Sequence, residues 1–273
     1  MRAARIGAGR MGRPICDRLI AAGYPLVVMA RSDAAQRAAS ADGLDWRATI
    51  ADVVAEADVV FCVVLNDAQV RSVCLGADGA LAAMKPGAIL VQHTTSDPET
   101  ARLLGEAAAA RGVSVLDAAL SGGPHDIAAG RLTLWVGGQA QALAAARPLL
   151  ETYAAPILPV GDLGDGQKVK LVNNALFVAQ VGLAIDAVRL AGALGIEEAA
   201  ILAALQHGSG ASRGLAVVAG GGSVAAVAGR LGALMEKDVA MVRSASAHAG
   251  VDLGVLGAVL ESDAVVRQVL GGE

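Results

Sequence analysis

The sequence predicts an α/β protein in which an N-terminal domain with a mostly parallel sheet is followed by an all-α C-terminal domain. Between residues 3 and 150, short apolar runs alternate with helical patterns, which is typical of parallel strands joined by helical crossovers. A glycine-rich turn follows the first apolar run, at residues 7–12. After Gly164 the alternation ends, and the rest of the chain is predicted to form helices separated by glycine-rich turns.

Strands are expected where short, mostly apolar runs lie between turn signals, because strands of a parallel sheet are buried on both faces. These runs lie at residues 3–6, 26–30, 59–65, 88–92, 113–117 and 132–136. Helices are expected at residues 11–22, 98–111, 139–150 and 167–193, and the last of these is long and apolar. Gly23 and Gly195 are the predicted stops of the first and last of these helices.

A cluster of turn residues near residues 160–166 separates the two patterns. Pro159, Gly161, Gly164 and Gly166 lie in or beside this segment, and a chain of 273 residues is long enough for two domains with buried cores. We therefore expect one domain at 1–162 and a helical domain at 163–273.

Composition and charge argue against several classes of protein. The formal net charge is −4 and the 22 Lys and Arg residues form no cluster, which argues against a nucleic-acid partner. The three cysteines, Cys16, Cys62 and Cys74, lack metal-ligand spacing, so we expect reduced thiols and no metal site. No signal peptide and no uninterrupted apolar span is visible, so we expect a cytoplasmic protein with no membrane partner.

The turn at residues 7–12 has the pattern G-x-G-x-x-G between a strand and a helix, and a second strand follows within about 30 residues. Gly7 permits the tight turn, Gly9 lets the backbone approach a pyrophosphate, and Gly12 allows the helix to pack closely on the strand. Free N–H groups at the helix N-terminus then hold the phosphates. The motif predicts a Rossmann domain that binds a dinucleotide.

The two residues after the second strand, Arg31 and Ser32, predict which dinucleotide binds. An NAD-selective site carries Asp or Glu at this point to hold the ribose 2′-hydroxyl. A guanidinium instead pairs with a 2′-phosphate, which a carboxylate would repel. The sequence therefore favours NADP(H) over NAD(H).

Five segments, taken in order and spacing, resemble the β-hydroxyacid dehydrogenase family. This family includes 3-hydroxyisobutyrate dehydrogenase, tartronate semialdehyde reductase and succinic semialdehyde reductases. The segments are G-x-G-x-M-G-x-P at 7–14, HTTSDP at 93–98, DAALSGG at 117–123, GDGQKVKLVNN at 164–174 and KDV at 237–239. The resemblance runs from about residue 5 to about residue 254.

The resemblance implies an oxidoreductase that transfers hydride between NADP(H) and a small carboxylate, namely a β-hydroxy acid or its semialdehyde or keto acid. It implies that the catalytic residues are Lys170, Asn174 and Ser121, and that the substrate is bound by Ser121, Gly122, Gly123 and Asn174. The expected cofactor-binding residues are Gly7, Gly9, Arg10, Met11, Gly12, Arg31, Ser32, Val64, Leu65, Thr95 and Lys237.

The chemistry of these residue types fits the implied roles. Lys170 and Asn174 are four residues apart, so on a helix they share one face and can reach the same small substrate. The Lys170 ammonium can give a proton to a developing alkoxide, and the neutral amine can take one from a hydroxyl. Lys168 is two residues earlier on another side of the helix, and we expect it to be solvated. Small residues at 121–123 leave backbone N–H groups for a carboxylate.

Several alternatives remain open. An imine reductase-like enzyme would share the architecture, but the resemblance implies that such enzymes usually lack a lysine at position 170. A non-catalytic NADP-binding scaffold would not need Lys170, Asn174 and Ser121 together. His125 and Asp126 either contact the substrate or form a surface turn. The resemblance also implies a homodimer or homotetramer that packs through the long helix at 167–193.

Overall fold

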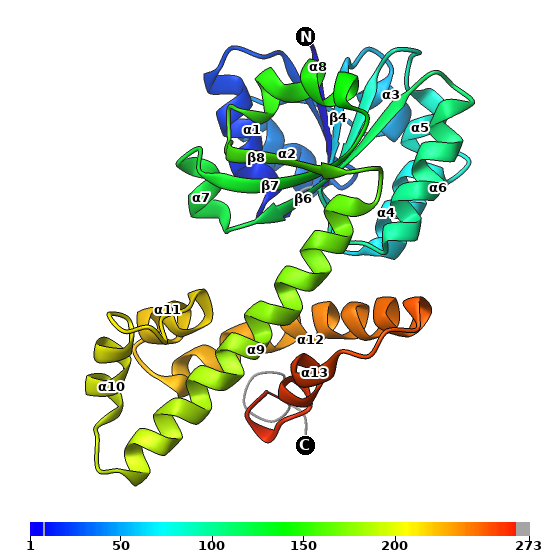
Figure 1. Cartoon of the computed structure of the whole chain (residues 1–273). Helices are drawn as coiled ribbons and strands as arrows, with labels where there is room; N and C mark the ends of the chain where they lie inside the picture. Colours follow the sequence, from blue (N-terminus) through cyan, green and yellow to red (C-terminus); the bar gives the residue numbers. More distant parts are fainter. Residues whose placement is uncertain (8, 266–273) are drawn as a thin grey trace. The chain divides into compact units, whose positions relative to one another are not determined.

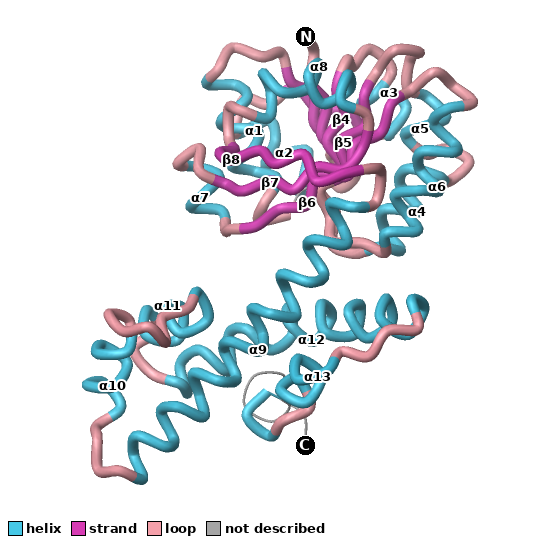
Figure 2. Tube along the Cα trace, viewed as in Figure 1, coloured by secondary structure: helices cyan, strands magenta, loops and turns pink. Residues whose placement is uncertain are grey.

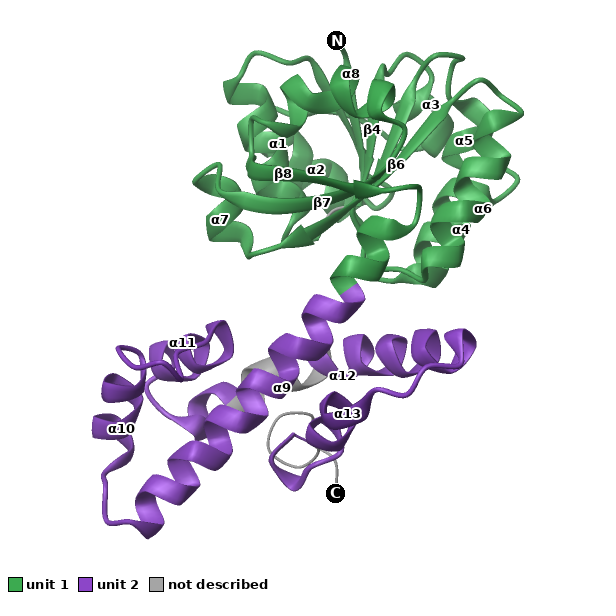
Figure 3. Cartoon of the chain, viewed as in Figure 1, with its two compact units in different colours: residues 1–170 green, residues 171–273 purple. Residues whose placement is uncertain are grey.

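The computed structural model describes residues 1–7 and 9–265, without the side chains of 228–234. The described chain forms two compact units, Met1–Lys170 and Leu171–Glu273 (Figure 3). The boundary between the units falls inside one long helix rather than in a linker. The domains expected at 1–162 and 163–273 remain a prediction.

Unit 1 is built on an eight-stranded sheet with the order β3-β2-β1-β4-β5-β6-β7-β8. Figure 2 shows the strands of this sheet in magenta, all of them within unit 1. Neighbouring strands are parallel except for β6 and β7, which pair antiparallel. The strands are β1 Ala3–Ile6, β2 Leu26–Met29, β3 Asp45–Arg47, β4 Val59–Cys62, β5 Ile89–Gln92, β6 Ser114–Ser121, β7 Leu132–Gly138 and β8 Ala154–Gly161. This is the mostly parallel sheet that the alternation of apolar runs and helices predicts, so the predicted fold class is confirmed.

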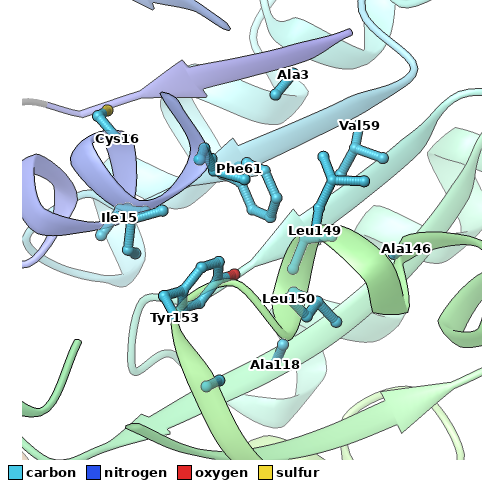
Figure 4. Close-up of a cluster of buried hydrophobic side chains, with 14 of the residues drawn as sticks. Ala3, Ile15, Cys16, Val59, Phe61, Ala118, Ala146, Leu149, Leu150 and Tyr153 are labelled. Carbon is cyan, nitrogen blue, oxygen red and sulfur yellow. The ribbon is translucent and has the colours of Figure 1, made fainter. Parts of the chain in front are cut away.

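Helices cover both faces of this sheet (Figure 1). One face packs against α1 Gly12–Ala21, α2 Asp33–Ala41, α7 Pro124–Ala128 and α8 Ala140–Leu150. The other face packs against α3 Ile50–Val54, α4 Asp67–Leu75, α5 Ala80–Ala83 and α6 Pro98–Ala109. Because side chains alternate along a strand, Ala3 and Phe61 enter the first core, whereas Ala4 and Val60 enter the second. Figure 4 shows Phe61 in the first core, together with Ile15 and Tyr153.

Two strands at the edges of the sheet were not predicted from the sequence. β3 has three residues, all exposed or half-buried, so it carries no apolar run. β8 has a single buried residue, Ala154, and contains Pro156 and Pro159. Proline is tolerated on an edge strand because one side of that strand donates no ladder hydrogen bonds. The strand conformation of β3 and β8 is therefore supported by pairing with β2 and β7 rather than by an apolar run in their own sequence.

Unit 2 is helical, as expected. Its elements are the main part of α9 Asp165–Ala193, then α10 Glu198–Leu205, α11 Arg213–Gly220, α12 Val224–Ala249 and α13 Gly254–Leu260. The side chains of Ser212 and Ser223 cap α11 and α12, and Gly250 ends α12 in the left-handed conformation. A core of small aliphatic residues joins the helices, among them Val178 and Val218.

Helix α9 is long and apolar enough, by length and composition, to cross a membrane. Half of its most apolar window is buried inside the structure, with a mean hydropathy of 1.6 over that window. The core helix of a globular protein has the same properties, because a helix that is packed on most sides is apolar on most sides. α9 contributes buried side chains such as Val178 and Val181 to the core of unit 2, as a core helix does.

A buried polar pair connects the end of β5 to the segment after α8. His93 is 1% exposed; its Nδ1 lies 2.6 Å from the carbonyl oxygen of Ala118, and its Nε2 lies 2.8 Å from the Tyr153 hydroxyl. The His93 ring also stacks on Phe61, with ring centroids 5.8 Å apart. Burial lowers the pKa of His93 to about 4, although its hydrogen bond to Ala118 acts to raise it. The folded protein therefore holds this imidazole neutral at pH 7.

This depressed pKa predicts that acid destabilises the fold through His93. The unfolded imidazole binds its proton near pH 6.5 and the folded one near pH 4, so the free energy of unfolding falls as the pH drops between these values. The loss due to His93 approaches about 3 kcal/mol. Burial raises the pKa of Asp117 to about 6, so protonation of Asp117 increases the free energy of unfolding over the same pH range. Because the two effects oppose each other, the test requires a reference protein.

The reference is the double variant His93→Phe/Tyr153→Phe, which keeps Asp117 and replaces both hydrogen-bonding partners by rings of similar shape. Urea unfolding at about pH 7 and about pH 4.5 measures both proteins. We expect the wild type to lose stability relative to the variant on acidification. Equal losses in the two proteins would show that His93 is not held neutral.

Candidate functional site

The predicted site residues of unit 1 gather along one edge of the sheet. Gly7, Arg31, Val64, Thr95 and Ser121 follow or end β1, β2, β4, β5 and β6. These five strands are parallel to one another, so their carboxyl ends meet at the same edge. The chain runs outward from β1 to β3 and resumes on the other side of β1 at β4. Ligands of open α/β sheets bind at this kind of switch point.

The glycine turn has the geometry that a dinucleotide requires. Gly7 has a φ of +105°, and a Cβ there would lie 2.0 Å from the carbonyl oxygen of Val63, so only glycine fits between β1 and β4. The Gly12 N–H donates to the carbonyl oxygen of Gly9 at 3.0 Å. A Cβ added to Gly9 would meet no described atom within 4 Å, which leaves room for a ligand against the backbone. Ala8 lies outside the described residues.

The end of β2 presents a cation. Arg31 is exposed, as is Arg10 in the glycine turn. Ser32 caps α2, since its hydroxyl oxygen accepts the N–H of Ala35 at 3.2 Å. The oxygen of Ser32 is therefore engaged by its own helix, while Arg31 extends from the end of a buried strand. Met11 stands at the N-cap position of α1.

The ends of β4 and β5 are held together by a threonine to which the sequence analysis gave no role. Thr94 accepts the Val64 N–H at 2.9 Å and donates its hydroxyl to the Val64 carbonyl at 3.0 Å. Thr95, the residue predicted to contact the cofactor, is half-buried beside it. Leu65 is 70% exposed at the same edge.

The segment after β6 differs in one respect from what the sequence led us to expect. Ser121 ends β6 half-buried, and Gly122 has a φ of +125°. The Gly123 N–H, expected to be available to a carboxylate, donates at 2.8 Å to the carboxylate of Asp126. His125 lies 3.2 Å from the same carboxylate and is 75% exposed. Asp126 thus caps α7, and its negative charge lies next to the proposed substrate segment.

A buried network fixes the first turn of α9 to the sheet. Asp117, fully buried in β6, accepts the N–H groups of Gly164 at 2.7 Å and Gln167 at 2.8 Å. The Gln167 side chain accepts the Ser96 N–H at 2.9 Å and donates to the side-chain oxygen of Gln92 at 2.9 Å. Burial raises the pKa of Asp117 to about 6, against the two backbone donors that lower it. Neither Asp117 nor Gln167 was predicted from the sequence to have a role of its own.

The two lysines of α9 are in different environments. Lys168 is 65% exposed and pairs with Asp165 at 2.8 Å, which is the solvated position expected for it. Lys170 is half-buried and lies three residues after Gln167, so it lies on the side of α9 that the network ties to the sheet. Its position is therefore set by the same contacts that fix the first turn of the helix.

Asn174, one turn after Lys170, is 7% exposed and belongs to unit 2. Its side-chain N–H donates at 2.8 Å to the carboxylate of Asp238 in α12, and its oxygen accepts from Asn173 at 3.2 Å. The ammonium of Lys237 lies 3.9 Å from the other Asp238 oxygen. The structure therefore connects two predicted residues, Asn174 and Lys237, through an aspartate that the sequence analysis had quoted without a role.

A surface hollow of about 390 Å³ lies between the end of α12 and α13, lined by residues such as Arg243, Asp252 and Glu261. None of the predicted site residues lines it. Within residues 1–7 and 9–265, no group of three or more His, Cys, Asp or Glu side chains is arranged to hold a metal ion.

Comparisons with known proteins agree with this geometry. The model of the NAD binding domain of 6-phosphogluconate dehydrogenase matches residues 2–161. The NAD-dependent L-serine dehydrogenase of Pseudomonas aeruginosa is 38% identical over 78% of this chain and 71% of its own length. The structure of Mycobacterium tuberculosis 3-hydroxyisobutyrate dehydrogenase with L-serine has a TM-score of 0.84 and 28% identity, covering 95% of this chain and 91% of that one. Psf3 in complex with NADP⁺ and 2-OPP has a TM-score of 0.81 and 27% identity, covering 99% of this chain and 96% of that one.

The sheet order, the switch point and the glycine turn together define an NAD(P)-binding oxidoreductase. More particularly, the chain belongs to the β-hydroxyacid dehydrogenase family, whose members act on the CH–OH group of hydroxy acids. The resemblance drawn from five short segments of sequence is thereby confirmed.

Proposed function

We propose that the protein is an NADP(H)-dependent dehydrogenase that interconverts a small β-hydroxy acid and its semialdehyde or keto acid, with Lys170 as the general acid and base. The observation that carries this proposal is the placement of Lys170. It follows a helix turn that Gln167 fixes to the carboxyl end of β5 and that Asp117 fixes to the middle of β6. A proton-transfer group must be held within reach of the reacting oxygen, and a buried hydrogen-bond network supplies that constraint.

In the proposed reaction the nicotinamide, when bound, supplies or accepts the hydride. Lys170 gives its proton to the substrate oxygen during carbonyl reduction and takes it back during oxidation. Asn174 has a second N–H beyond the one donated to Asp238, and this N–H is assigned to the same substrate oxygen. The ammonium and the amide are one helical turn apart, which suits two contacts to a single atom.

The substrate carboxylate is assigned to the hydroxyl of Ser121 and the N–H of Gly122. The N–H of Gly123 is excluded from this role while Asp126 accepts it at 2.8 Å. The Asp126 carboxylate is 16% exposed and lies beside this segment. The similarity to an L-serine dehydrogenase and to a structure with L-serine supports a small monocarboxylate of this kind.

The preference for NADP(H) rests on Arg31. This exposed guanidinium stands at the end of β2, where a carboxylate would hold the ribose of NAD(H). The similar proteins differ in their cofactor: the L-serine dehydrogenase is NAD-dependent by name, whereas the Psf3 structure contains NADP⁺. The other proposed cofactor contacts are Gly7, Gly9, Arg10, Met11, Gly12, Ser32, Val64, Leu65, Thr95 and Lys237.

We also propose that residues 1–162 bind the cofactor and residues 163–273 serve substrate binding and self-association, in a cytoplasmic homodimer or homotetramer. Support for self-association comes from an apolar stripe on α9 made by Val172, Leu176, Leu183 and Leu190, which are 51–66% exposed. Spacings of four and seven residues place these side chains on one face. A second copy of the chain would bury that face.

A substrate panel tests the proposed activity. Oxidation of NADPH is followed with small semialdehydes and keto acids, and reduction of NADP⁺ with β-hydroxy acids, including L-serine. We expect turnover of at least one monocarboxylate pair. Cyclic imines complete the panel. Turnover of the imines alone would support the imine reductase alternative, whereas cofactor binding without any turnover would support a non-catalytic scaffold.

Lys170→Ala should lower kcat by about 100-fold or more, because it removes the proton-transfer group. The affinity for the cofactor should change little, so the loss should appear in kcat rather than in the cofactor Kd. Lys168→Ala is the matched control, since Lys168 is two residues away, solvated and paired with Asp165. A Lys170→Ala enzyme as active as the Lys168→Ala enzyme would remove Lys170 from the mechanism.

Arg31→Asp should shift the preference toward NAD(H). It exchanges a guanidinium that pairs with the 2′-phosphate for a carboxylate that repels it. We expect the ratio of kcat/KM for NADPH to that for NADH to fall by about tenfold or more, equivalent to about 1.4 kcal/mol. Arg37→Asp, a change of the same charge within α2, is the control. A ratio that stays at the wild-type value would contradict the assignment of NADP(H) through Arg31.

A further inference from the structure

Strand β1 contains a charged residue where the fold requires apolar ones. Its four residues are all buried, with Ala3, Ala4 and Ile6 at 0% exposure and Arg5 at 5%. Arg5 lies between two parallel neighbours, β2 and β4, on an interior strand of the sheet. Because side chains alternate along the strand, it points to the same face as Ala3, the face that α1 covers.

The Arg5 guanidinium lies directly beneath the glycine turn. Its Nη1 donates a hydrogen bond to the carbonyl oxygen of Gly7. A Cβ placed on Gly12 would lie 2.5 Å from the same nitrogen and 3.4 Å from Arg5 Cδ. A side chain at position 12 would therefore have to displace the Arg5 guanidinium from beneath the turn.

No ion pair joins the Arg5 charge to a carboxylate of the described residues, and its buried Nε has no hydrogen-bond partner among them. Asp17, in the adjacent helix α1, is 52% exposed and pairs with Arg13 at 2.8 Å. The thiol of Cys16 interacts with Arg5, but burial raises the pKa of Cys16, so the thiol is neutral at pH 7. A buried guanidinium without a counter-charge is costly, because it has lost its hydration without a compensating anion.

We propose that Arg5 is a binding residue for the diphosphate of the dinucleotide, and that its buried positive charge is balanced by that dianion. The diphosphate of a dinucleotide binds over the turn at residues 7–12, on the other side of the backbone that Arg5 contacts. Attraction across such a short, dry path is weakly screened by solvent. Arg5 thus adds a fixed cation to the partial charge at the N-terminus of α1.

The proposal rests on dinucleotide binding at this turn and is independent of the choice between NADP(H) and NAD(H), because both carry the diphosphate. It also predicts a trade between stability and affinity. In the free protein the unbalanced charge lowers stability, and in the complex it raises affinity. An arginine with a purely structural role would instead stabilise the free protein, so its removal would lower the melting temperature.

The test compares Arg5→Met, Arg5→Lys and the wild type. Arg5→Met keeps an unbranched chain of similar length without the charge, and Arg5→Lys keeps the charge on a different head group. The matched control is Arg18→Met, because Arg18 lies at the far end of α1 and donates its Nε to the Thr152 carbonyl at 2.5 Å. Calorimetric titration gives the Kd of NADP⁺, NAD⁺ and ADP-ribose, and thermal unfolding gives the Tm of each free protein.

We expect Arg5→Met to weaken the binding of NADP⁺, NAD⁺ and ADP-ribose alike, by roughly tenfold or more, the size typical of an interaction with a charged group. The Kd of adenosine 2′-monophosphate, which lacks the diphosphate, should not change. The free Arg5→Met protein should melt at the wild-type temperature or above it. Arg5→Lys should retain most of the affinity, and Arg18→Met should bind all four ligands as the wild type does.

The proposal is overturned if Arg5→Met binds ADP-ribose as tightly as the wild type, or if it weakens adenosine 2′-monophosphate to the same extent. It is also overturned if Arg5→Lys loses as much affinity as Arg5→Met. None of these results depends on turnover. A wild-type protein that binds the dinucleotides but reduces no substrate would therefore refute the proposed activity while leaving the role of Arg5 measurable.

Discussion

Two backbone N–H groups at the start of α9 donate to one carboxylate, that of Asp117, inside the sheet. This interaction determines where the long helix begins, and Gln167 extends it to β5 through Gln92 and Ser96. A buried carboxylate is costly unless it is hydrogen-bonded, and a helix N-terminus offers both free donors and a favourable dipole. The Asp117 carboxylate therefore gains donors, and the N–H groups of Gly164 and Gln167 gain an acceptor, through the same hydrogen bonds. Lys170 follows within one turn, so its position depends on a constraint that lies in the sheet.

The carboxyl edge of the sheet combines two kinds of residue with different physical roles. Some keep their polar atoms engaged within the protein, as Thr94 does with Val64 and Asp126 does with Gly123. Others are exposed at this edge, as Arg31 and Leu65 are. The first kind fixes the geometry of the edge, and the second kind are the side chains that we propose to contact the cofactor, which is the division expected for a preorganised site.

The sequence was sufficient for the parts of the molecule that carry a local signal. Buried parallel strands such as β4 are continuous apolar runs, and Gly7 stands in a motif whose geometry only glycine allows. Contacts between distant segments carry no such signal. The edge strand β8, the bond from Asn174 to Asp238 and the capping of Gly123 by Asp126 all depend on pairs that the fold brings together. Arg5 could have been noticed as a charge within an apolar run.

The most direct test is the kcat of the Asp117→Asn variant. It asks whether the hydrogen bonds from the start of α9 to the Asp117 carboxylate determine the position of Lys170. The change keeps the shape of the side chain but turns one acceptor into a donor that faces the N–H of Gly164 or Gln167. If Asp117 positions Lys170, kcat should fall by roughly tenfold to 100-fold, because the proton-transfer group is displaced. The Kd of the cofactor, which is proposed to bind at the glycine turn, should stay near the wild-type value. A folded Asp117→Asn enzyme with the wild-type kcat would contradict the account.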